Sequence, residues 1–77
     1  MDASVLCQQL LDHIARELPE EQEALLGLAA LASFHPDEVR LFVTEATLLL
    51  LRHGRSLPEP LAGEVMRRLA GPTAVGT

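Results

Sequence analysis

Four side chains in this sequence could take part in acid–base, nucleophilic or metal chemistry near neutral pH. They are one cysteine and three histidines, Cys7, His13, His35 and His53. Their spacing fits no metal-binding motif, because the chain contains neither an HExxH nor a CxxC sequence. No serine lies in a GxSxG sequence, and no glycine-rich loop could hold a phosphate. We therefore expect a protein that is not an enzyme and that binds no metal, cofactor or small-molecule substrate.

Structural roles explain three of these side chains. Cys7 lies among apolar residues, so we expect it to be a small core residue. His35 directly precedes Pro36, which is typical of a cap or a turn. His53 comes near the end of a predicted helix, where a positive charge opposes the helix dipole. The chain has a single cysteine and so cannot form an intrachain disulfide.

Composition favours helices and argues against several classes of partner. Sixteen of the 77 residues are Leu and ten are Ala, while Trp, Tyr, Lys and Asn are absent. The formal charge of −5 argues against nucleic-acid binding, which relies on clustered basic residues. The longest uncharged run, residues 24–36, is shorter than the roughly 20 apolar residues that span a bilayer. Without the basic region of a signal peptide, and with no Lys or Asn, the sequence indicates a bacterial, cytoplasmic protein that binds no membrane.

Proline, glycine and the spacing of apolar residues divide the chain into four helices. We expect them at about residues 3–18, 20–33, 36–53 and 58–70. Pro19 and Pro36 suit the first turns of the second and third helices, and Gly54 suits a left-handed cap after the third. Short loops favour antiparallel neighbours. The sequence therefore predicts an all-α domain over residues 1–71, a compact bundle of four short helices, followed by a disordered tail at 72–77.

The second and fourth predicted helices carry further expectations about packing. Residues 24–32 are apolar on every side, which is typical of a buried central helix. Gly27 lies in this stretch, where it would allow a neighbouring helix to approach closely. On the fourth helix we expect Val65 and Met66 on the core face and Glu64 on the opposite face.

The third predicted helix has two apolar faces. At about 100° per residue, one broad arc forms the expected core face. It holds Val39, Phe42, Val43, Ala46, Leu49, Leu50 and His53. The opposite side holds Leu41, Thr44, Leu48 and Leu51, with the 3-4-3 spacing of a coiled-coil seam. We call these four residues the outer stripe; Arg40, Glu45 and Arg52 flank it.

Three arrangements would cover the outer stripe. The other three helices cover it within the chain, or a second copy covers it in a homodimer, or a different protein binds to it. Leaving three leucines in water is unfavourable, since burying each contributes about 1.5–3 kcal/mol. A chain this small also gains much by burying area between subunits.

These features favour a small non-catalytic protein–protein interaction module. It would mask or escort a partner protein, as an anti-activator, adaptor, regulator or secretion chaperone does. The outer stripe would make the apolar contact, and Arg40, Glu45 and Arg52 would set the orientation at its rim. Two alternatives stay open. One is a DNA-linked transcriptional regulator or phage or plasmid accessory protein of helix-turn-helix type. The other is a structural subunit of a larger assembly.

In size, acidic charge and number of helices the chain resembles the acyl carrier proteins. Members of that family carry an Asp-Ser-Leu sequence that places a modified serine at the start of a helix. Here the third predicted helix begins with His35-Pro36-Asp37-Glu38, and the nearest serine lies in Ala32-Ser33-Phe34. Because the modified serine is absent, we expect no prosthetic group and assign the chain to another class.

Overall fold

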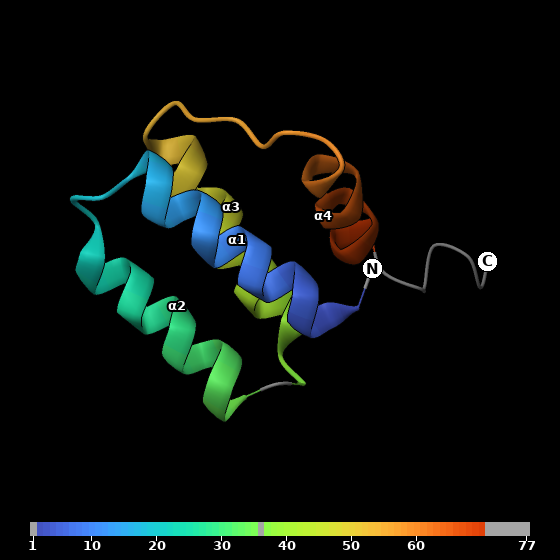
Figure 1. The fold of residues 1–77 in the computed structure, drawn as a ribbon. Helices are drawn as coiled ribbons and strands as arrows, with labels where there is room; N and C mark the ends of the chain where they lie inside the picture. Colours follow the sequence, from blue (N-terminus) through green and yellow to red (C-terminus); the bar gives the residue numbers. More distant parts are fainter. Residues whose placement is uncertain (1, 36, 71–77) are drawn as a thin grey trace.

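Four α-helices make up the secondary structure of residues 2–35 and 37–70, the parts of the chain that the computed structural model describes (Figure 1). They are α1 (Ala3–Glu17), α2 (Gln22–Phe34), α3 (Val39–Arg52) and α4 (Leu61–Ala70). The predicted all-α bundle of four short helices is thus confirmed. The predicted tail, residues 72–77, lies outside the described residues.

Helices α1 and α3 form the centre of the bundle. Each contacts the other and both α2 and α4, whereas α2 and α4 do not touch within the described ranges. In Figure 1, α1 lies in front of α3, and α2 and α4 lie on opposite sides of this pair. The largest fully buried side chains come from α1, its C-terminal cap and α3. They are Leu6, Leu10, Ile14, Leu18, Phe42, Val43 and Leu50.

A turn precedes each of α2 and α3, so both helices begin later in the chain than predicted. Glu21 N–H donates to the carbonyl of Leu18 at 3.0 Å, so Pro19 lies in a β-turn and α2 begins at Gln22. The prediction that Pro19 opens the helix is wrong, because proline fits the second position of such a turn equally well. Likewise, Glu38 N–H donates to the carbonyl of His35 at 2.9 Å, and α3 begins only at Val39. The predicted start at Pro36 falls on a residue outside the described ranges.

The fourth helix also begins later than predicted, at Leu61 rather than at residue 58. The carbonyls of Pro58 and Pro60 accept hydrogen bonds from Ala62 and Glu64, at 2.9 and 3.1 Å. These bonds satisfy N–H groups of the first turn, which have no acceptor within the helix itself.

The end of α3 has the cap that the sequence predicts. Gly54 has a φ of 68°, the left-handed conformation that glycine adopts without a steric penalty. Its N–H donates to the carbonyl of Leu51 at 3.0 Å, and Arg55 N–H donates to that of Leu50 at 2.9 Å. These two bonds are those of a Schellman motif, which ends the helix and satisfies its last carbonyls.

Helix α2 is a peripheral helix, and the prediction that it is central and buried is wrong. Of its side chains only Leu28 is buried, while Leu26 is 69% and Phe34 76% exposed. The physical reason is the number of neighbours, since α2 packs against α1 and α3 but not against α4. Gly27 is exposed and lines a groove between α2 and α3, where an added Cβ would meet nothing within 4 Å. The predicted close approach of a helix at Gly27 is therefore wrong as well.

Helix α4 is rotated relative to the predicted orientation. Leu61 and Val65 are buried as expected, but Glu64 is only 8% exposed and Met66 is 67% exposed. The Glu64 carboxylate pairs with the guanidinium of Arg67, one turn further along the helix. This pairing lessens the cost of burying a charged group.

Candidate interaction surface

The outer stripe lies on the side of α3 that faces away from the core. Leu41 is 45% exposed, Leu48 is 49% exposed and Leu51 is 63% exposed. The arc that was expected to face the core does so at Phe42, Val43, Ala46, Leu49 and Leu50, all of which are buried. The other helices of the described chain therefore leave the outer stripe in contact with water. Among residues 2–35 and 37–70, the arrangement in which the other helices cover the outer stripe is therefore wrong.

Thr44 is the one polar residue of the outer stripe, and its hydroxyl is already satisfied. Thr44 Oγ1 donates to the carbonyl of Arg40, one turn earlier in α3, at 2.8 Å. The side chain therefore adds no unpaired hydroxyl donor to the surface of the stripe. The stripe is thus effectively apolar from Leu41 to Leu51.

The residues expected to flank the outer stripe differ in their surroundings. Arg40 Nη2 donates to the carbonyl of Leu69 at 3.0 Å, in the last turn of α4. The carbonyl of Leu69 lies in the last turn of α4, where the helix itself supplies no N–H donor for it. The bond from Arg40 therefore satisfies this carbonyl and joins α3 to α4. Glu45 and Arg52 lie on the opposite flank, where they border a groove of about 320 Å³ between α2 and α3. Arg40 is therefore a structural contact in this chain, whereas Glu45 and Arg52 are exposed at the rim.

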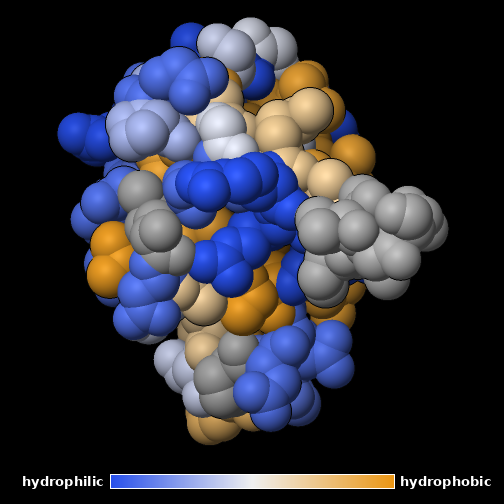
Figure 2. All heavy atoms as spheres, turned by 90° about the vertical axis from the view of Figure 1, so that its right-hand side faces the viewer, coloured by the Kyte–Doolittle hydropathy of each residue, from blue (hydrophilic) through white to orange (hydrophobic). Residues whose placement is uncertain are grey.

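The side of the molecule on which α4 lies has a different character. Figure 2 shows hydrophilic atoms gathered at the centre of this face, with separate hydrophobic patches around them. Met66 of α4, which is 67% exposed, stands next in sequence to Arg67 and Arg68. Here hydrophilic groups separate the apolar patches from one another, in contrast to the row of leucines on α3. The outer stripe is the better candidate for an apolar interface.

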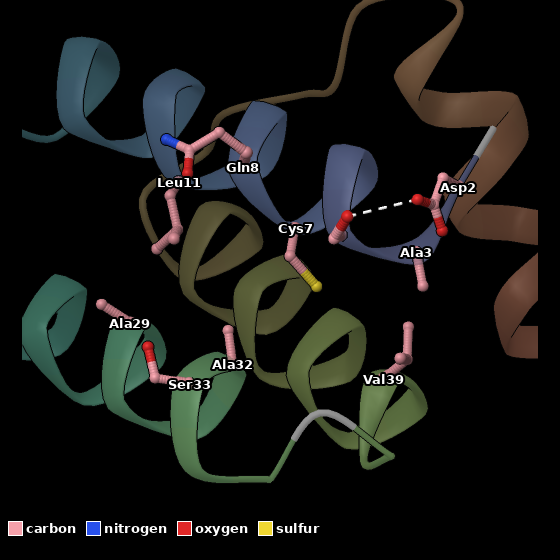
Figure 3. Close-up of a pocket in the computed structure, with 10 residues that line it drawn as sticks. Asp2, Ala3, Cys7, Gln8, Leu11, Ala29, Ala32, Ser33 and Val39 are labelled. Carbon is pink, nitrogen blue, oxygen red and sulfur yellow. Dashed lines mark hydrogen bonds between the residues drawn. The ribbon is translucent and has the colours of Figure 1, made fainter.

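A second hollow lies between α1, α2 and the start of α3, with a volume of about 450 Å³. Its wall is formed largely by small side chains, among them Ala3, Ala29, Ala32 and Ser33 (Figure 3). The Cys7 thiol points from α1 toward this hollow. Cys7 is only 9% exposed, which confirms the prediction of a core position. Burial raises the pKa of its thiol above the ordinary value, and the charge of Arg68 lowers it by a smaller amount. Such a thiol is a poor nucleophile at neutral pH.

The three histidines lie apart from one another on different elements. His13 is buried on α1, and its Nε2 has no hydrogen-bond partner within the described ranges. His35 caps the end of α2, where its N–H donates to the carbonyl of Leu31 at 2.9 Å, as expected of a cap residue. His53 follows α3 and contacts Glu21 through Nε2 at 2.8 Å. In the part of the chain that the structure describes, no three His, Cys, Asp or Glu side chains are grouped as a metal site would require.

Sequence reasoning missed two exposed apolar side chains on α2. Leu26 lies within residues 24–32, which are predicted to be buried because a helix that is apolar on every side is usually surrounded by neighbours, and Phe34 comes just after this stretch. Their exposure, 69% and 76%, exceeds that of any leucine in the outer stripe. Nothing in the local sequence separates them from Leu28, which is buried in the same helix.

We compared the chain with known protein families, curated proteins and solved structures. Neither a protein-family model nor a curated protein nor a solved structure matches the chain. Among the described helices, none combines the length and the apolar character needed to cross a membrane.

Proposed function

We propose that this protein is a small, cytoplasmic, non-catalytic interaction module that masks or escorts another polypeptide. It would act as an anti-activator, adaptor or secretion chaperone does, by burying the outer stripe of α3 against its partner. One observation carries the proposal: Leu41, Leu48 and Leu51 are each about half exposed or more, in one row on a helix whose other face is core.

The energetics support a binding role for this row. A leucine side chain contributes about 1.5–3 kcal/mol when it is moved from water to an apolar environment. The three leucines follow one another at intervals of seven and three residues, and with Thr44 they line one side of the helix, as the anchors of helix-binding surfaces do. Glu45 and Arg52 stand beside the row with opposite charges, and they would select partners and orient them more than they would add affinity.

A pair of matched variants tests the proposal. Leu48→Glu places a charge in the centre of the outer stripe, whereas Leu26→Glu makes the same change at an exposed leucine of α2. Tagged wild-type protein and both variants are used to recover binding proteins from an extract of the native host. We expect wild type and Leu26→Glu to recover the same polypeptide and Leu48→Glu to lose it. Equal recovery by all three proteins, with unchanged circular dichroism, would contradict the proposal.

A further inference from the structure

The outer stripe is self-complementary when two copies of α3 lie antiparallel. Its four positions, 41, 44, 48 and 51, are symmetric about the level of residue 46. In an antiparallel pair centred at that level, Leu41 of one copy lies opposite Leu51 of the other. Thr44 then lies opposite Leu48, so that every position of the stripe meets another position of the stripe.

The charges at the two ends of α3 favour the same orientation. Asp37 and Glu38 precede the helix, whereas Arg52 closes it and Arg55 follows its cap, and all four residues are exposed. An antiparallel pair brings the acidic end of each copy to the basic end of the other. A parallel pair would instead place like charges together at both ends, which disfavours it.

The flank of the outer stripe that borders α2 carries three charges at intervals of seven residues. They are Glu38, Glu45 and Arg52, and they share one side of the helix. Across the antiparallel pair, Glu38 of each copy faces Arg52 of the other, which gives two attractive contacts. Glu45 faces its own symmetry mate near the axis, which gives one repulsive contact.

On these grounds we propose that, in the purified protein, the outer stripe is covered by a second copy of this chain, with the two α3 helices antiparallel. The inference rests on the proposed function, because both take the outer stripe as a binding surface. It adds that the molecule bound there is a second copy of the chain. A second copy supplies both the matching row of leucines and the matching charges. A partner protein that uses the stripe would then compete with self-association.

Sedimentation of the pure protein over micromolar to millimolar concentrations tests whether a second copy of the chain covers the outer stripe. Because two acidic chains repel over distance, the measurement is made at physiological ionic strength, where screening acts over about 8 Å. We expect wild type and Leu26→Glu to form dimers and Leu48→Glu to remain monomeric. If wild-type protein stays monomeric over the whole range, the inference of a homodimer is overturned. The recovery of binding proteins from the host extract would then still test whether the outer stripe binds a different protein. A dimer unaffected by Leu48→Glu would count against both.

Charge exchange tests the antiparallel register directly. Glu38→Arg and Arg52→Glu should each weaken the homodimer by about three- to tenfold, because each creates like-charged contacts on the flank. Mixed together, the two variants should associate with each other as strongly as wild type, since both flank contacts are then attractive again. Glu45→Gln should tighten the dimer by removing the repulsion near the axis. A mixture no stronger than the single variants would exclude this register.

Discussion

Glu21 Oε1 lies 2.8 Å from His53 Nε2, so the residue before α2 is joined to the residue that follows α3. Both side chains are about one-third exposed. Nearby in sequence, Arg55 Nη1 lies 3.9 Å from Glu17 Oε1, between two side chains that are more exposed. The two contacts tie the end of α1 and the turn before α2 to the segment that follows α3.

The Glu21–His53 contact should stabilise the fold measurably. In a double-mutant cycle with Glu21→Ala and His53→Ala, we expect a coupling free energy of about 0.5 kcal/mol, typical of a partly exposed pair. The longer Glu17–Arg55 contact is the control, and its coupling should be smaller. Urea denaturation provides the measurement. A coupling free energy no larger than that of the Glu17–Arg55 control would show that the Glu21–His53 bond does not stabilise the fold.

The two sides of α3 should respond very differently to truncation. Leu50 is 1% exposed, so Leu50→Ala should lower the free energy of unfolding by about 3 kcal/mol through a core cavity. Leu48 is 49% exposed, so Leu48→Ala should change it by less than about 1 kcal/mol in the monomer. Thermal unfolding at low protein concentration compares the two. Equal losses would mean that the outer stripe belongs to the core.

Removal of an unsatisfied hydroxyl should stabilise the protein. Thr47 Oγ1 is buried without a hydrogen-bond partner within the described ranges, so Thr47→Val should raise the free energy of unfolding by about 1 kcal/mol. The matched control is Thr44→Val, which removes the hydroxyl that donates to Arg40 and should bring no such gain. The midpoint of urea denaturation distinguishes the two. A lower midpoint for Thr47→Val would indicate that the hydroxyl has an acceptor after all.

The end of α4 should depend on Arg40. Because the Arg40 guanidinium donates to the Leu69 carbonyl, Arg40→Met should destabilise the last turn of α4 by about 1 kcal/mol. Amide hydrogen exchange in α4 should become faster, while exchange in α1 stays the same. Arg52→Met, at the other flank of the outer stripe, is the control and should leave α4 unchanged. Uniformly faster exchange would instead reveal a loss of global stability.

The Cys7 thiol should react slowly in the folded protein. Since burial raises its pKa, the native state holds the thiol proton more tightly than the unfolded state does. Its contribution to stability is therefore present below the unfolded value, near 9.0, and falls as the pH rises above it. Alkylation should be slow at neutral pH and fast in denaturant. Cys7→Ala should remove part of the stability loss seen in alkaline solution, and an identical loss in this variant would assign it to other groups.

The sequence by itself determined the number of helices, their approximate ranges and the two apolar faces of α3. These features depend on local causes, namely the 3.6-residue period, the restrictions that proline imposes and the left-handed conformation of Gly54. It also placed Leu41, Leu48 and Leu51 together on the side opposite the core.

Only the tertiary structure decided which apolar faces are covered. Helix α2 has the more apolar sequence, yet α3 is central, because α1 and α3 each contact three helices while α2 contacts two. The same packing buries Glu64, exposes Met66 and brings Arg40 to the end of α4. Periodicity shows that a face is apolar, but coverage depends on neighbours that come from distant parts of the chain. For the outer stripe of α3, no other helix of the described chain supplies that neighbour.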